Sequence, residues 1–181
     1  MFRYLITFFF CVFGALYADP ANAEEIDWTT ASFEEAQKFV QSGNEVNIFD
    51  EDGQTLLMKA AMNTSNPDVV NLLIDADADV NAQNKYGLTP LMIAAGKNNL
   101  AAVKLLLNNG ANVNATSKKG ITALHLSMFS KNSELIKELL RAGADVNAQE
   151  EKHITALMIA SSEEVNASPD IKEMMIKAGA K

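Results

Sequence analysis

The feature that most constrains this chain is a motif that returns about every 33 residues. Four equivalent positions mark it: Gly53, Gly87, Gly120 and His153, which lie 34, 33 and 33 residues apart. A threonine follows each of them two residues later, and a leucine follows two residues after that. A fixed period of this length is typical of stacked supersecondary units, each of which contacts only its neighbours. The sequence therefore predicts a repeat solenoid rather than a closed globule.

Local signals predict two short helices in each copy of the motif. Before the first helix stand threonines that can cap it, because their hydroxyls accept hydrogen bonds from free N–H groups of the opening turn: Thr55, Thr89, Thr122 and Thr155. Pro90 suits the first helical position, where no N–H is needed. After the second helix, Gly110 and Gly143 suit the left-handed residue that ends it, and Asp77 takes this place one copy earlier.

Apolar spacing predicts which helix faces are buried. In the second helices, residues with helical spacing form stripes at Val103, Leu106 and Leu107 and at Ile136, Leu139 and Leu140. In the first helices, the pairs Ala60-Ala61 and Ala94-Ala95 are small enough to let the two helices of a unit approach closely.

Two stretches carry a specific resemblance. GLTPLMIAA at residues 87–95 and GITALHLSM at residues 120–128 resemble the ankyrin motif G-x-T-P-L-H-x-A-A. LLLNNGANVNA and ELLRAGADVNA resemble its closing L-L-x-x-G-A-D-V-N-A, and the resemblance covers residues 31–181. It implies an all-α repeat solenoid of stacked helix-turn-helix ankyrin units with β-hairpin-like connecting turns.

The period divides the chain into five expected units after a leader. We expect a degenerate capping unit at 24–49, ankyrin units at 50–83, 84–116 and 117–149, and a C-terminal capping unit at 150–181. In the first unit, Ser32 to Glu35 form a capping-box pattern, and Phe33, Ala36, Phe39 and Val40 form one helical stripe. Residues 25–30 are expected to form a shortened helix. The last unit carries Ser161-Ser162-Glu163-Glu164, which suits a wet outer face.

The N-terminus has the pattern of a cleaved secretory signal. Arg3 precedes an apolar run from Leu5 to Leu16, and Ala21-Asn22-Ala23 gives the small-x-small pattern of a cleavage site. We predict a signal peptide at 1–23, cleaved between Ala23 and Glu24, with Ala18 as the alternative site. The alternative of a membrane anchor is disfavoured because the uncharged stretch is shorter than the roughly 20 residues that a spanning helix needs. The predicted location is periplasmic or secreted.

Composition narrows the function further. The formal net charge is −8, which favours neither nucleic acid nor anionic lipid as a partner. The single cysteine, Cys11, lies in the predicted signal, so the remaining chain can form no disulfide. No metal, phosphate-loop or nucleophile motif is found, and we expect neither an enzyme nor a cofactor.

Histidine and methionine are the candidate ligand types of this sequence. His125 stands at the histidine of the motif, where its ring is expected to hydrogen-bond the adjoining turn, and His153 is expected to be solvated in a turn. Met58, Met92 and Met158 recur at the repeat period, which would suit copper(I). Packing of the core between helices is the favoured interpretation because methionine fills irregular gaps.

The resemblance places partner binding on a concave face lined by the turns and the first helices. Carried over by position, the expected exposed contacts are Lys85, Tyr86, Leu88, Lys97, Lys118, Lys119, Ile121, Phe129, Lys152 and Ile154. Aromatic anchors ringed by lysines suit a protein interface. We expect a monomeric, non-catalytic protein-binding module with an unidentified protein partner. The resemblance also suggests an accessory factor of an envelope enzyme or stress response; a secreted effector that binds host proteins is the alternative.

Overall fold

A computed structural model describes residues 26–63 and 66–181. Its helices follow one another along the chain as α2 (Phe33–Gln41), α3 (Leu56–Met62), α4 (Pro67–Asp75), α5 (Pro90–Gly96), α6 (Leu100–Asn108), α7 (Ala123–Ser127), the 3-10 helix η1 (Met128–Ser130), α8 (Ser133–Arg141), α9 (Ala156–Ser161) and α10 (Pro169–Lys177). The predicted leader and its cleavage site at Ala23 and Glu24 lie outside the described residues.

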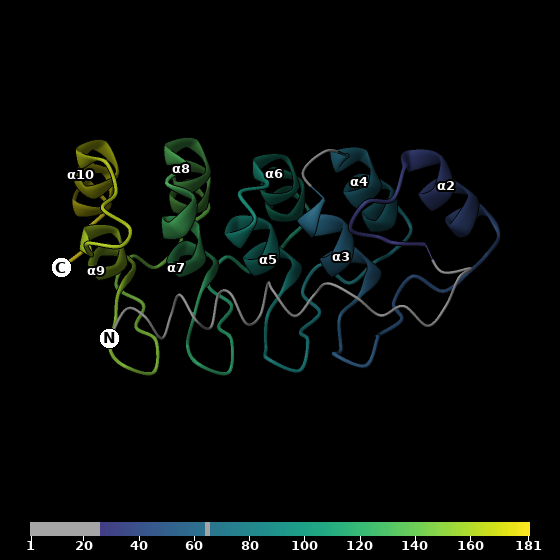
Figure 1. Cartoon of the computed structure of the whole chain (residues 1–181), viewed down its shortest axis with the longest axis horizontal. Coiled ribbons are helices and arrows are strands. Elements are labelled where there is room, and N and C mark those ends of the chain that lie inside the picture. The colour runs from purple at the N-terminus through teal and green to yellow at the C-terminus, as the bar shows by residue number, and fades with distance from the viewer. Residues whose placement is uncertain (1–25, 64–65) are drawn as a thin grey trace.

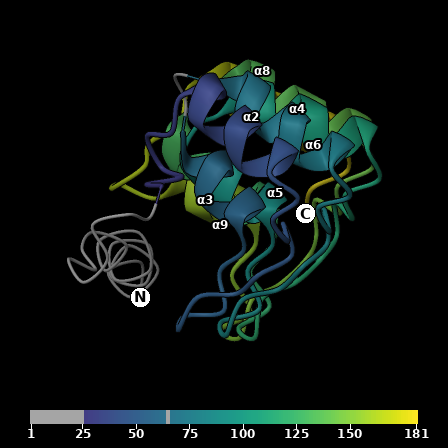
Figure 2. The same cartoon turned by 90° about the vertical axis from the view of Figure 1, so that its right-hand side faces the viewer.

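The helices stack in two rows to form an elongated solenoid. The first helices α3, α5, α7 and α9 make one row, and α2, α4, α6, α8 and α10 make the other (Figure 1). The turns that precede the first helices project together to one side of the stack, as the end view shows (Figure 2). The described residues contain no β-strand, only one isolated bridge between Phe49 and Thr55. The predicted all-α solenoid is confirmed.

Each first helix begins where the sequence predicts it. The hydroxyls of Thr55, Thr89, Thr122 and Thr155 accept the backbone N–H three residues ahead, at 3.2, 3.3, 3.4 and 3.4 Å. Pro90 occupies the first turn of α5, as expected. The helices end as predicted too, because Gly110, Gly143 and Asp77 all have positive φ, at 83°, 85° and 63°.

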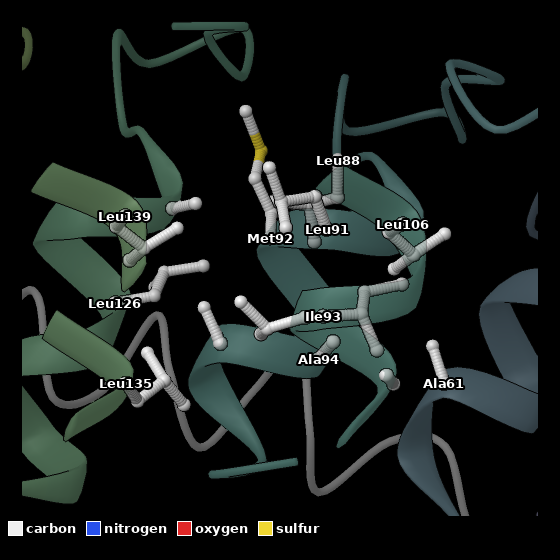
Figure 3. Close-up of a cluster of buried hydrophobic side chains, with 14 of the residues drawn as sticks. Ala61, Leu88, Leu91, Met92, Ile93, Ala94, Leu106, Leu126, Leu135 and Leu139 are labelled. Carbon is white, nitrogen blue, oxygen red and sulfur yellow. The ribbon is translucent and has the colours of Figure 1, made fainter. Parts of the chain in front are cut away.

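The core is a continuous layer between neighbouring units. Around α5, side chains from three successive units meet, with Ala61 on one side and Leu126, Leu135 and Leu139 on the other (Figure 3). The alanine pairs 60–61 and 94–95 are fully buried, as predicted. The predicted stripes are buried at Val103, Leu106, Ile136 and Leu139, whereas Leu107 and Leu140 are only half-buried at the stripe edge.

Asparagine side chains join each unit to the next. Asn81 donates from Nδ2 to the carbonyl of Gly110 at 3.1 Å and accepts at Oδ1 the N–H of Asn112 at 2.8 Å. The same pair of bonds recurs from Asn47 to Asp77 and Asp79, from Asn114 to Gly143 and Asp145, and from Asn147 to Gly179 and Lys181. We call this series the asparagine ladder. The left-handed residue at each helix end supplies the carbonyl that the ladder binds.

The first unit closes one end of the stack. Ser32 and Glu35 form the predicted capping box, with their reciprocal bonds at 2.9 and 3.2 Å. The predicted short helix over residues 25–30 is wrong for its described part, which forms a turn closed by Thr30 N–H to Asp27 O at 3.0 Å. A turn suits this segment because Trp28 is then buried edge-on against Phe39, with ring centroids 5.1 Å apart.

The last unit differs on its outer face. Ser161, Glu163 and Glu164 are exposed, as predicted, whereas Ser162 is buried. The buried hydroxyl of Ser162 is satisfied, because its Oγ donates to the carbonyl of Ile159 at 2.8 Å and accepts the N–H of Val165 at 3.3 Å.

Glycine in the turns is required by two constraints at once. Gly87 has φ of +76°, and a Cβ built on it would lie 2.7 Å from the backbone nitrogen of Lys118 in the next turn. His153, also at positive φ, replaces the fourth glycine because no further turn packs against it within the described residues. The close approach of successive turns therefore decides where a side chain is tolerated.

We expect Gly87→Ala to destabilise the fold more than Gly110→Ala. Both changes place alanine in the left-handed region, which costs about 1–2 kcal/mol. Only Gly87→Ala also creates a backbone clash, since nothing lies within 4 Å of a Cβ at Gly110. The clash should add about 1–3 kcal/mol, measured as the difference in free energy of unfolding in urea. Equal losses in the two variants would contradict the close packing of the turns.

Candidate functional site

A turn of four residues precedes each of the first helices α3, α5, α7 and α9. The four turns lie at residues 50–53, 84–87, 117–120 and 150–153. In each, the first residue's side-chain oxygen accepts the N–H groups two and four residues ahead. The oxygens are Oδ1 of Asp50, Oδ1 of Asn84, Oγ of Ser117 and Oε1 of Glu150, at 2.7–3.2 Å. Four different side chains therefore build the same turn.

Backbone bonds join the turns into one row. The N–H of Lys85 donates to the carbonyl of Asp52 at 3.2 Å, that of Lys118 to Tyr86 at 3.0 Å, and that of Glu151 to Lys119 at 2.9 Å. In each case the second residue of one turn binds the third residue of the turn before. We call this row the turn ladder. It fixes the position of each turn relative to its neighbours, and the side chains at the second and third positions are left at the tips.

The tips hold several of the predicted contact residues. Lys85, Tyr86, Lys118 and Lys152 are exposed, and Lys119 is half-buried. Lys85 forms an ion pair with Asp52, and its Nζ lies 5.2 Å from the ring centroid of Tyr86. The ladder therefore brings these side chains together on adjacent turns, as the carried-over positions implied.

Lys97 and Phe129 lie apart from the tips, at the C-terminal ends of the first helices. Lys97 follows α5 directly, and Phe129 lies in η1 after α7; both are half-buried. Partial burial lowers the pKa of Lys97 below its ordinary value, because desolvation disfavours the ammonium form. Phe129 packs against the core.

The expectation that Leu88, Ile121 and Ile154 are exposed is wrong. Each side chain is 1% exposed and belongs to the core. After the left-handed residue, the backbone becomes extended and pairs with the first residue of the turn. For example, the N–H of Asn84 donates to the carbonyl oxygen of Leu88 at 3.1 Å. This pairing directs the side chain to the helices, as Figure 3 shows for Leu88 near Leu91. These residues hold the turns on the stack and cannot contact a partner.

The sequence reasoning missed an exposed apolar pair at Ile48 and Phe49. Their side chains are 39% and 61% exposed, and Phe49 pairs with Thr55 at the base of the first turn. A signal for them exists, because Ala-Gln, Ala-Thr and Ala-Gln occupy the equivalent positions in the other copies. Alignment of the repeat closings VNIF, VNAQ, VNAT and VNAQ would have singled out this pair.

His125 has the structural role that was predicted. Its Nδ1 accepts the N–H of Thr122 at 3.2 Å, so Nε2 carries the proton and donates to the carbonyl of Ile154 at 3.1 Å. The second bond ties α7 to the next turn. Burial is the main cause that lowers the pKa of His125 below its ordinary value, which keeps the ring neutral.

The three methionines at the repeat position differ in their burial. Met58 and Met92 are buried in the core, as the favoured interpretation predicted, but Met158 is 48% exposed because no other unit packs over this face of α9 within the described residues. Among residues 26–63 and 66–181, no group of three or more histidine, cysteine or acidic side chains is placed to hold a metal. Over the same residues, no helix combines the length and apolar character needed to cross a membrane.

A comparison with protein families gives one match. A model described as Ankyrin repeats (3 copies) matches residues 30–117 and, in a second placement, residues 97–181. The two placements overlap and together cover all the helices named above. No match to a curated protein was found.

We expect His125→Met to reduce the loss of stability on acidification. The unfolded chain binds a proton at His125 below its ordinary pKa of about 6.5, whereas the lowered pKa in the fold delays that uptake. Stability from this site is therefore present above about pH 6.5 and is lost as pH falls toward the lowered value. By pH 5 the loss is at most about 2 kcal/mol.

Methionine is the matched replacement because it occupies the equivalent position in the other copies. The measurement is the free energy of unfolding in urea at pH 7 and pH 5 for both proteins. The variant should lose less stability between these pH values than the wild type. An equal loss would show that His125 gains its proton as easily in the fold as in the unfolded chain.

Proposed function

We propose that this chain, which belongs to the ankyrin-repeat family, is a non-catalytic module that binds a protein partner outside the cytoplasm. Ankyrin repeats generally serve as interaction modules rather than as enzymes, and the family match covers residues 30–181. The partner surface consists of the turn tips and the C-terminal ends of the first helices. We call it the tip face, and its members are Lys85, Tyr86, Lys97, Lys118, Lys119, Phe129 and Lys152.

The observation that carries this proposal is the turn ladder. Each turn is fixed from within by a side-chain oxygen and from outside by a bond to a neighbouring turn. Binding a partner therefore requires little ordering of the tip backbone, and lower ordering cost favours affinity. Because the turns are built by their first and fourth residues, the second and third can vary without loss of the fold.

Export is the second part of the proposal, and it rests on the N-terminal sequence. The charge, apolar run and Ala21-Asn22-Ala23 pattern support a leader that is removed after Ala23. A periplasmic or secreted chain with its only cysteine in the leader would owe its stability to packing alone. The burial of a continuous core across the described units is consistent with that requirement.

The proposal is tested by cross-linked capture with tagged protein from the osmotic-shock fraction of its own cells. A tip variant with Tyr86→Ala, Lys118→Glu and Lys119→Glu is compared with the wild type. Its control carries Ile176→Ala, Lys104→Glu and Lys177→Glu on the outer helices, with the same change in charge. Circular dichroism establishes that all three proteins fold alike. Phe129 is left intact because it packs against the core.

We expect a protein that the wild type and the control capture and that the tip variant loses, with affinity reduced by about tenfold or more. Hot-spot side chains commonly have effects of this size. Equal capture by all three proteins would contradict the tip face as the binding surface. Recovery of the chain in the cytoplasm, with residues 1–23 still attached, would contradict export.

A further inference from the structure

The charges on the turn tips differ from those of the whole chain. The chain has a formal net charge of −8, yet the second, third and fourth turns carry four lysines. We call them the tip lysines: Lys85, Lys118, Lys119 and Lys152. The tip face is therefore a basic strip on an acidic protein. Such a strip favours a negatively charged partner at this surface.

Three of the five carboxylates in the turns are engaged within the fold, and Glu51 of the first turn is exposed. Asp50 lies 3.1 Å from Lys59, and Asp52 pairs with Lys85. Glu150 is 4% exposed, and its Oε1 accepts the N–H groups of Lys152 and Ile154. Glu151 remains as the exposed carboxylate among the tips of the last three turns. The strip therefore begins beside Asp52 and extends through the third and fourth turns.

The spacing of the strip follows from the stack. The turn ladder holds each turn against the next, and packed helices lie about 8–10 Å apart. A polyproline II segment rises about 3.1 Å per residue with three residues per turn. Every third side chain of such a segment therefore points the same way at intervals of about 9 Å. This interval matches one unit of the stack.

We infer that the tip face binds an extended acidic segment of a protein partner, with carboxylates at every third residue that pair with the tip lysines of successive turns. The inference rests on the proposed function, because it names the chemistry of the partner for that same surface. Lys85 and Lys118 occupy the second positions of successive turns, and Lys119 and Lys152 occupy the third positions. The turn ladder therefore sets the members of each pair one unit apart, and this favours segments whose charges have the same spacing. Lys97, half-buried after the C-terminal end of α5, lies at the helix side of this surface and apart from the tips.

The test uses synthetic fluorescent peptides of about 12 residues, rich in proline so that they adopt polyproline II. One peptide carries glutamate at every third residue, and a second has the same composition with its glutamates adjacent. A third replaces each glutamate with glutamine. Dissociation constants are measured by fluorescence anisotropy with the mature chain at low and physiological salt. Vesicles rich in phosphatidylserine serve as a separate anionic probe.

We expect the spaced peptide to bind about tenfold more tightly than the adjacent one, and the glutamine peptide to bind weakest. Lys118→Glu with Lys119→Glu should weaken the spaced peptide by about tenfold. Lys104→Glu with Lys177→Glu changes the net charge equally and should have little effect, since both residues lie on outer helices. Higher salt should weaken binding because the contacts lie at the surface.

Equal affinity for the spaced and adjacent peptides, or an equal loss in both double variants, would overturn the inference, because either result indicates general attraction to polyanions. Binding to the vesicles but not to the peptides would overturn it too.

The capture experiment separates failure of this inference from failure of the proposed function. A captured protein that depends on the tips, without peptide binding, keeps the proposed function and rejects the acidic segment. Spaced-peptide binding without any captured protein supports the charge pattern and contradicts the cellular role.

Discussion

The structure depends on contact between each unit and the next. A pair of helices such as α5 and α6 has apolar side chains on both flanks, and neither flank is buried without a neighbour. Apolar burial supplies most of the stabilisation, but it does not by itself fix the rotation or height of one unit against another. Directional bonds do so: the asparagine ladder at the helix ends and the turn ladder at the tips.

These two ladders also explain why the turns can serve function while the rest of the unit serves the fold. The first position of each turn needs only a side-chain oxygen, and Asp50, Asn84, Ser117 and Glu150 all supply one. The fourth position needs positive φ and, where another turn follows, no Cβ. The second and third positions make the bonds of the turn ladder through their backbone, whatever their side chains, so those side chains can change with the partner. Each four-residue turn therefore keeps the same backbone while its side chains differ from one unit to the next.

The sequence predicted the periodic parts of the fold well, because each is decided by local chemistry. Threonine caps, Pro90 and the left-handed residues behave as their types require, and His125 binds the adjoining turn. The errors arose where a side chain's direction depends on tertiary contact. The motif position predicts Leu88 at the surface, yet the backbone pairing of its turn directs it to the core. Met158 shares its repeat position with buried methionines, but its burial depends on a following unit.

Exposure of the candidate site residues was therefore predicted correctly for Lys85, Tyr86, Lys118 and Lys152, and was wrong for Leu88, Ile121 and Ile154. Lys85, Lys118 and Lys152 are exposed because the turn tips face solvent and a long charged side chain keeps its ammonium group in water. Apolar residues beside them can point either way, and the position in the motif does not tell which. Ile48 and Phe49 show the converse, since they stand where alanine and a polar residue recur and lie exposed.

The central claim is that the tips form one preorganised row before any partner binds. Amide hydrogen exchange of the free chain tests it most directly, because the N–H groups of Lys85, Lys118 and Glu151 are the donors of the turn ladder. We predict that these three amides are protected and exchange together with the ladder amides of Asp79, Asn112 and Asp145, through a shared opening of neighbouring units. Exchange of the three tip amides at the rate of an unstructured peptide, while the helices stay protected, would contradict the claim.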